Sequence, residues 1–225
     1  LLADVPLEST LNVKKSVTID GNGKTIAGSI LVTANTTFAG TLNLGGNVKV
    51  TDGATLTVAA DAVVTGATSF FGAGNDASYY GIDNGETASG TIIINGTLSI
   101  QQMNANAGGV VTVAEGGKLT TEIICVENGS IENATAGVMN INGEVETQRF
   151  NVFGGATATV GATGVLSSEQ AFTNTAMANV ISVWDGGQLI INGTVTAAQI
   201  EHTEGRHSGM NVGENSAVII SGTLN

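Results

Sequence analysis

A glycine followed two residues later by Leu or Val recurs through the second half of the chain, and it restricts the possible folds more than any other feature. The six glycines are Gly96, Gly117, Gly143, Gly164, Gly193 and Gly222, at spacings of 21, 26, 21, 29 and 29 residues. Two of the wider intervals, 96 to 143 and 117 to 164, are both 47 residues, which indicates duplication of a two-coil unit. Internal repeats of about 20 to 50 residues are typical of solenoids, in which each repeat packs on the next.

Between these glycines, apolar and polar residues alternate as they do in half-buried strands. Examples of the apolar pairs are Leu56/Val58, Ile92/Ile94 and Leu189/Ile191. Short clusters such as Asp52-Gly53 supply the backbone conformations of tight corners. No window shows the spacing of an amphipathic helix. The sequence therefore predicts one all-β domain over residues 1–225.

The expected architecture is a single-stranded right-handed parallel β-helix. A repeat of 21 to 29 residues accommodates about three short strands and their corners, and parallel crossovers are right-handed. At about 24 residues per coil, the chain predicts about eight or nine coils and a rod about 40 to 45 Å long. Residues 1–10 are expected to form an N-terminal lead-in or cap, and residues 65–90 a loop inserted between coils. The alternative, a β-sandwich, normally has hairpin turns and more Pro than the single one present.

Four polar residues stand five positions after their glycines and predict a structural ladder. They are Gln101, Glu122, Gln148 and Glu169. Equivalent positions of stacked coils lie about 4.8 Å apart, so amide side chains at these positions can hydrogen bond in a ladder. Alternation of Gln with Glu keeps neighbouring carboxylates about 10 Å apart, which limits their repulsion.

The run from Leu11 to Ile26 resembles the opening coils of pectate-lyase-like β-helices. The later Val-x-x-Gly-Gly-x-Leu and Ile-Asn-Gly-Thr-Leu/Val segments resemble the repeats of large bacterial surface and adhesin-like proteins. Together the resemblances cover residues 11–225. They imply a parallel β-helix in a bacterial protein with an extracellular or cell-surface location, but many unrelated activities use this fold.

Charge and composition exclude several classes of function. Nineteen acidic and seven basic residues give a net charge of −12, which opposes binding to nucleic acid and to anionic lipid. The chain lacks an apolar run long enough to span a membrane. Most acids are solitary and sit at Gly turns, and Arg149 and Arg206 are the only guanidinium groups, so we expect no catalytic residues and no cofactor. Cys125 lies among apolar residues and is expected to be an inert buried thiol.

Two polar clusters contain residue types that bind metals. The first is a set of oxygen-bearing side chains, Asn75, Asp76, Asp83, Asn84 and Glu86. The second, from Glu201 to His207, combines acids with both histidines and could chelate zinc. Because solvated loops have the same composition, we predict no metal site.

Aromatic residues are concentrated in the expected insertion. Phe70, Phe71, Tyr79 and Tyr80 are four of the nine aromatic residues. Tyr offers an apolar face and a polar tip, which suits contact with sugars or proteins. The rings form either such a binding surface or the packing of the loop against the rod.

The sequence predicts a non-enzymatic structural or adhesin-like module that contacts a host or cell-surface glycan or protein. The alternative is a carbohydrate-active β-helix protein, either a polysaccharide lyase or hydrolase or a glycan-binding module. A Thr-rich ice- or sugar-binding face is a third possibility, although the positions after the repeated glycines are mixed, as in Thr97, Lys118 and Glu144. Further coils or a neighbouring chain are expected to cover the C-terminal edge, because open strand edges favour pairing.

Overall fold

A computed structural model describes residues 1–73, 89–128, 135–171, 179–201 and 208–225. These residues form strands and turns, and the described part of the chain contains no helix. Every pairing between named strands is parallel, and one isolated bridge, between Thr51 and Ser89, is antiparallel. The all-β class predicted from the sequence is confirmed.

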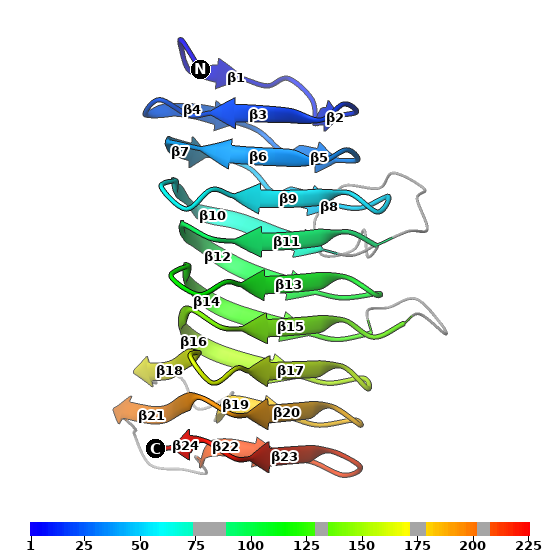
Figure 1. Cartoon of the computed structure of the whole chain (residues 1–225), viewed down its shortest axis with the longest axis vertical. Helices are drawn as coiled ribbons and strands as arrows, with labels where there is room; N and C mark the ends of the chain where they lie inside the picture. Colours follow the sequence, from blue (N-terminus) through cyan, green and yellow to red (C-terminus); the bar gives the residue numbers. More distant parts are fainter. Residues whose placement is uncertain (74–88, 129–134, 172–178, 202–207) are drawn as a thin grey trace.

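The strands form two sheets that run along the length of the stack (Figure 1). Sheet A has fifteen strands: β1 (Val5–Pro6), β2 (Leu11–Val13), β4 (Lys24–Ala27), β5 (Ile30–Val32), β7 (Thr41–Leu44), β8 (Val48–Val50), β10 (Val63–Ala73), β12 (Thr97–Ala105), β14 (Lys118–Val126), β16 (Glu144–Val152), β18 (Val165–Ala171), β19 (Asn179–Val183), β21 (Thr194–Glu201), β22 (Ser208–Val212) and β24 (Thr223–Leu224). Sheet B has nine: β3 (Val17–Asp20), β6 (Thr36–Ala39), β9 (Thr55–Val58), β11 (Thr91–Ile94), β13 (Val110–Val113), β15 (Val138–Ile141), β17 (Thr157–Val160), β20 (Gln188–Ile191) and β23 (Ala217–Ile220).

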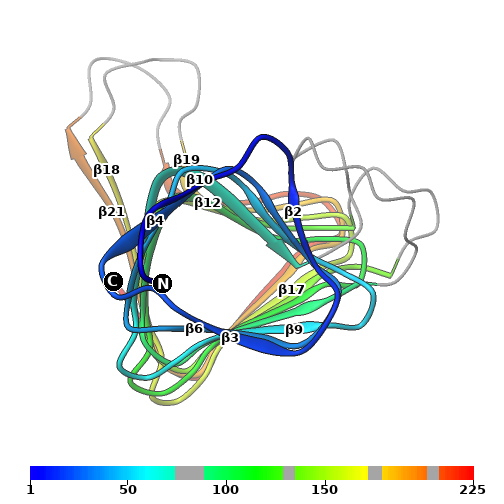
Figure 2. The ribbon, with the colours of Figure 1, turned by 90° about the horizontal axis from the view of Figure 1, so that it is seen from above.

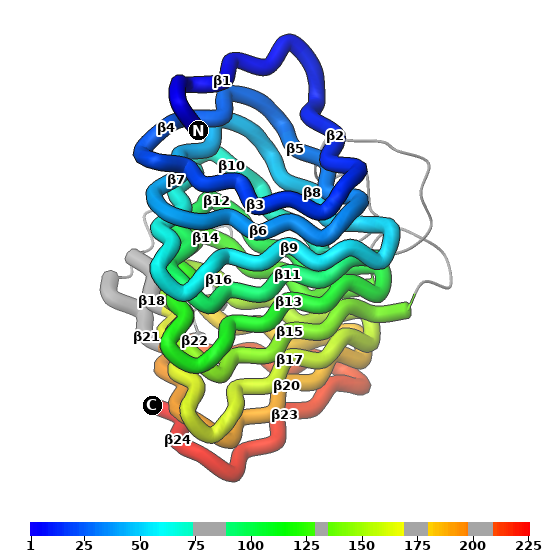
Figure 3. The backbone as a smooth tube through the Cα atoms, turned by 45° about the horizontal axis from the view of Figure 1, so that its top comes forward, coloured from blue at the N-terminus to red at the C-terminus, as the bar shows by residue number. Residues whose placement is uncertain are grey.

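Sheet B defines the levels of the stack, because its strands follow one another in chain order from β3 to β23. We call each of these strands, with the sheet A strands adjoining it in the chain, one level. Viewed from above, the strands of successive levels superpose around a common interior (Figure 2). The backbone passes from sheet A to sheet B and back as it moves from level to level (Figure 3). This arrangement is consistent with a β-helix-like solenoid.

The repeated glycines stand where one level touches the backbone of the level before it. A Cβ atom on Gly117 would overlap the carbonyl oxygen of Ile94, and each of the other five glycines would meet a backbone oxygen in the same way. Beside each contact, a backbone bond joins the levels, as where the amide of Lys118 donates to the carbonyl of Gly96 at 2.9 Å. The repeat found in the sequence is therefore a requirement for close approach between levels.

The core is a column of aliphatic side chains that continues through the levels. In sheet B the inward positions Ile94, Val113, Ile141, Val160 and Ile191 are register neighbours, and all are fully buried. Outward residues alternate with them and are partly exposed. Each level therefore buries its apolar side chains against the levels on both sides.

The structure describes residues 1–10, the expected N-terminal lead-in, and the first part of the expected insertion at 65–90. In residues 1–10, β1 pairs with β4, and Leu1, Val5 and Leu7 pack against the core. The expected insertion at 65–90 begins as strand, because β10 continues to Ala73 and pairs with β12 throughout its last four residues. Residues 74–88 lie outside the described residues.

Candidate functional site

Of the two alternatives for the four aromatic residues, a binding surface or packing against the rod, the structure supports packing for Phe71. Phe71 is fully buried, because strand alternation turns it into the core beside its register partners Val48 and Met103. Phe70 points to the other side of β10 and packs against Leu31. Tyr79 and Tyr80 lie outside the described residues. A contact surface made by all four rings is excluded by the position of Phe71.

The predicted ladder residues occupy equivalent positions in successive levels. Residues beside them are register partners, as Gln102 with Ile123, Ile123 with Arg149 and Thr147 with Ser168, which places Gln101, Glu122, Gln148 and Glu169 at equivalent points of the chain. Among the described side chains, those of Gln101, Glu122 and Gln148 make no hydrogen bond to one another. Their backbone carbonyls, however, each accept a bond from the next level.

Buried hydroxyl groups one residue before the ladder positions supply these bonds. Thr121 Oγ1 donates to the carbonyl of Gln101 at 2.8 Å, and Thr147 Oγ1 to that of Glu122 at 3.3 Å. Ser168 Oγ donates to the carbonyl of Gln148 at 3.4 Å. All three hydroxyl residues are buried. Strands β14, β16 and β18 thus carry a structural hydroxyl ladder, which we define as Thr121, Thr147 and Ser168. Its signal in the sequence was the Thr or Ser that precedes Glu122, Gln148 and Glu169.

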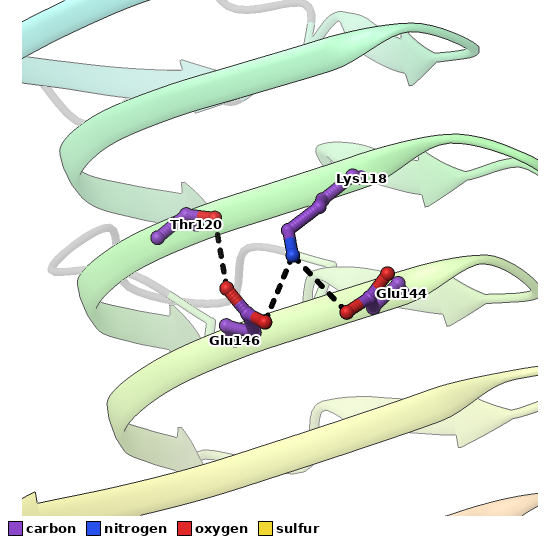
Figure 4. Close-up of polar contacts among 4 residues, drawn as sticks. All are labelled: Lys118, Thr120, Glu144 and Glu146. Atoms are coloured by element: carbon purple, nitrogen blue, oxygen red, sulfur yellow. Dashed lines mark hydrogen bonds and ion pairs between the residues drawn. The ribbon is translucent and has the colours of Figure 1, made fainter.

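An ion-pair cluster lies on the outer side of sheet A (Figure 4). Lys118 Nζ lies 3.1 Å from Glu144 Oε1 and 2.8 Å from Glu146 Oε1, and Thr120 Oγ1 donates to Glu146 Oε2 at 3.3 Å. The hydrogen bond from Lys118 lowers the pKa of Glu146, and the same bond raises the pKa of Lys118. Sequence analysis missed this cluster because only the pairing of β14 with β16 brings its members together.

A shallow depression of about 330 Å³ adjoins this cluster. Its lining is mainly hydroxyl-bearing and consists of Thr120, Thr121, Glu146, Thr147, Gln148 and Ser167. Glu146 is the only carboxylate in that lining, and the lowered pKa keeps it ionised. A general acid must hold a proton at the working pH. Glu146 is therefore unsuited to act as a general acid in this depression.

The outer side of sheet B has a different chemistry, with hydroxyl, amide and aliphatic groups. Eight of its nine strands contain no Asp, Glu, Lys, Arg or His, and the ninth, β3, contains only Asp20. We call this surface the neutral face. One of its two central columns consists of Thr18, Thr37, Thr57, Ile93, Thr112, Asn140, Thr159, Ile190 and Ile219. The other contains Thr55, Thr91, Val110, Val138, Thr157, Gln188 and Ala217.

The first three levels of the neutral face form a shallow hollow of about 600 Å³. Its lining is Ser16, Val17, Thr18, Asn35, Thr36, Thr37, Thr55 and Thr57. Charged side chains do not take part in this lining. A ligand here would meet groups that donate and accept hydrogen bonds, together with their methyl groups.

An aromatic pair that the sequence analysis missed lies at a corner beside the neutral face. The rings of Phe153 and Trp184 are stacked, with centroids 4.9 Å apart and an interplanar angle of 18°. Trp184 is 46% exposed. Each aromatic residue follows a Val, and a Gly-Gly pair comes directly after Phe153 and one residue after Trp184. This shared context was the available signal in the sequence that the two rings are equivalent.

Cys125 is not a core residue, in contrast to the expectation from its apolar neighbours. Ile124 and Val126 are fully buried, whereas Cys125 occupies the intervening outward position and is only partly buried. Desolvation raises the pKa of the thiol to about 11, and the charge of Glu127 adds to this effect. Asn151 Nδ2 lies 3.9 Å from its Sγ atom. The thiol is therefore protonated and poorly nucleophilic at neutral pH.

The two clusters considered for metal binding lie largely outside the described residues. They span 75–86 and 201–207, and of the second only Glu201 belongs to a described strand. Elsewhere in the described ranges, no three or more His, Cys, Asp and Glu side chains are grouped so as to hold a metal ion. Within the same ranges, no helix is long and apolar enough to cross a membrane.

Comparison of the chain with protein-family models, with curated proteins and with solved structures gives no match.

Proposed function

We propose that the chain is a non-enzymatic module of a secreted or cell-surface bacterial protein, acting as a rigid stalk or adhesin. In this proposal the stacked sheets form a right-handed parallel β-helix of eight or nine coils, similar to pectate-lyase-like and adhesin-like repeats. The observation that carries it is the unbroken in-register pairing of sheet B from β3 to β23. Such a stack gains length with every level and little width, as a stalk requires.

The chemistry of the outer surface favours display over catalysis. The carboxylates of Glu144 and Glu146 both bind Lys118, and the pKa of Glu146 is lowered. The net charge of −12 opposes the binding of acidic polysaccharides such as pectate and alginate. The ion-paired carboxylates and the net charge both make a polysaccharide lyase or hydrolase the weaker alternative.

The partner of such a module would be a host or cell-surface glycan or protein. We also propose that a further coil, or a neighbouring chain, covers the outer edge of the last level. There Ile219 and Ile220 are 51% and 49% exposed. An uncovered row of parallel backbone groups pairs readily with another strand.

Adherence and depolymerisation assays on the purified chain test the proposal together. Beads coated with the chain are expected to adhere to surfaces carrying glycans or matrix proteins more than albumin-coated beads do. Pectate and alginate incubated with the chain, with and without Ca²⁺, are expected to yield no unsaturated or reducing ends above a control without protein. Accumulation of such ends, or a compact particle in solution scattering, would overturn the proposal.

A further inference from the structure

The exposed indole of Trp184 presents an open ring surface beside the neutral face. One side of the indole stacks on Phe153, in the preceding level. In the following level Gly213 lies against Trp184, because a Cβ atom on Gly213 would meet Trp184 Cβ at 2.9 Å. Trp184 is nevertheless 46% exposed, so part of the indole remains open to solvent.

The backbone connects this pair directly to the neutral face. From Trp184 the chain turns through Asp185, Gly186 and Gly187 into β20, and the amide of Gly187 donates to the carbonyl of Trp184 at 3.0 Å. Phe153 leads into β17 by a similar turn, one level earlier. The aromatic pair therefore borders the part of the face formed by β17 and β20.

The outward side chains of β17 and β20 combine hydroxyl, amide and aliphatic groups. They are Thr157 and Thr159 in one strand, and Gln188 and Ile190 in the other. Hydroxyl and amide groups each donate and accept hydrogen bonds, as sugar hydroxyls do. Neither strand contains a charged residue, so a neutral ligand lying on β17 and β20 removes no charged group of these strands from water.

We propose that the neutral face and the Phe153–Trp184 pair bind an uncharged polysaccharide. A sugar ring stacks its C–H face on the indole of Trp184, and the hydroxyls of the following sugars bond to the Thr and Gln side chains. The face repeats at each level, about every 4.8 Å, so it matches a ligand that itself repeats. This inference deepens the proposed function, on which it rests for treating the chain as a binding module.

Other occupants of the neutral face fit the structure less well. Nine strands about 4.8 Å apart and about 13 Å of usable width give an area of about 500 Å². A face-to-face dimer would then bury about 1,000 Å² in total, less than the about 1,200 to 2,000 Å² of stable interfaces. An ice lattice would need uniform hydroxyl rows, whereas Ile93, Asn140 and Ile190 interrupt the column that contains Thr159.

Depletion assays with insoluble polymers test this inference. The chain is mixed with cellulose, chitin or mannan, and the protein left in solution is measured, with calcium pectate gel as the acidic comparison. We expect retention on at least one neutral polymer and none on pectate. Trp184→Ala and Thr159→Lys are each expected to weaken retention by about tenfold or more, through loss of stacking and introduction of a charge.

Matched variants separate binding from folding. Trp184→Phe keeps an aromatic ring and is expected to retain most of the binding. Ser99→Lys introduces the same charge at an outward position of sheet A and is expected to leave retention unchanged. Thermal unfolding of each variant, followed by circular dichroism, establishes that the stack is intact.

Three results would overturn the inference. The first is no retention of the parent chain on any neutral polymer, and the second is equal retention of the parent, Trp184→Ala and Thr159→Lys. The third is a dimer in sedimentation experiments that Thr159→Lys dissociates, which would make the neutral face an interface between copies. If the parent adheres to protein-coated surfaces but not to polysaccharide, the inference fails while the proposed adhesive function stands.

Discussion

The middle levels and the last level follow the same sequence pattern but bury their residues very differently. Ile191 in β20 and Ile220 in β23 occupy the same inward column and are register partners. Ile191 is fully buried, whereas Ile220 is 49% exposed. The residue type and the strand are alike, so the difference comes from whether a following level covers the side chain. In this fold a residue is buried by the level that follows as much as by its own.

Truncation of the two isoleucines gives the largest expected contrast. Ile191→Ala removes buried methyl groups from a covered column and is expected to lower the free energy of unfolding by about 2 to 5 kcal/mol. In the monomeric chain, where no neighbour covers the last level, Ile220→Ala removes groups already in contact with water and is expected to cost about 1 kcal/mol or less. Chemical denaturation of both variants measures the two effects. Equal losses would show that the last level is covered in solution.

The repeated glycines give a second, somewhat smaller contrast. In Gly143→Ala the new Cβ overlaps the carbonyl oxygens of Ala114 and Gly117, inside a stack closed on both sides. We expect a loss of about 1 to 3 kcal/mol, as for other overpacked sites. In Gly222→Ala the overlap is with the carbonyl of Gly193, but the last level is free to move outward. Its unfolding free energy should fall less, and an equal or larger fall would contradict this account.

The hydroxyl ladder lies in the middle levels and joins strands β14, β16 and β18 to the levels before them. Thr147→Val preserves the shape of the side chain but removes its bonds to the carbonyls of Glu122 and Arg149. The expected destabilisation is about 1 kcal/mol, measured by urea unfolding. Thr120→Val is the control, because its hydroxyl is only partly buried and bonds to Glu146. If both variants lose the same stability, the buried hydroxyl of Thr147 has no special role.

The smallest expected effect is the pH dependence that the Lys118 cluster gives to the middle levels. Because the pKa of Glu146 is lowered in the folded chain, its contribution is present above the ordinary value of 4.5 and is lost as the pH falls through the folded-state value. The raised pKa of Lys118 acts in the opposite direction, with stability lost only as the pH rises above 10.5.

Solvent screening keeps the contribution of this cluster small. The side chains of Lys118 and Glu146 are 35% and 46% exposed, so we expect a few tenths of a kcal/mol at most. The measurement is the difference in unfolding free energy between the parent and Lys118→Met, from pH 7 down to pH 3. The difference should shrink on acidification. A difference that grows would contradict the assignment.

The stack could be predicted from the sequence because each repeated glycine lies where one level contacts the backbone of the level before it. Gly117 and its equivalents are needed wherever one level touches the next, so their repeat reveals the number of residues per level. Alternation within strands then identified the inward column that includes Ile94 and Ile141. Both features are local in the sequence, and both were found in the structure.

Features that depend on pairing between levels could not be predicted in the same way. Whether Phe71 faces a partner or packs against the rod could not be decided from the sequence, because the sequence does not show that β10 extends to Ala73. The Lys118 cluster and the Phe153–Trp184 stack join residues from different levels, so they depend on register. Alternation assigns a side chain to one of two sides of a strand, but it does not identify the neighbour in the next level.

The orientation of the backbone bonds also determines how the stack responds to tension. The bonds between levels, such as that from the amide of Thr194 to the carbonyl of Gly164, run along the stack from one level to the next. The two ends of the chain lie at opposite ends of that axis (Figure 1). A pull on the ends therefore acts on the levels in series, and the bonds of one interface break before those of the next. Under force we therefore expect the molecule to lengthen in successive steps, each releasing the residues of a single level while the rest remain folded.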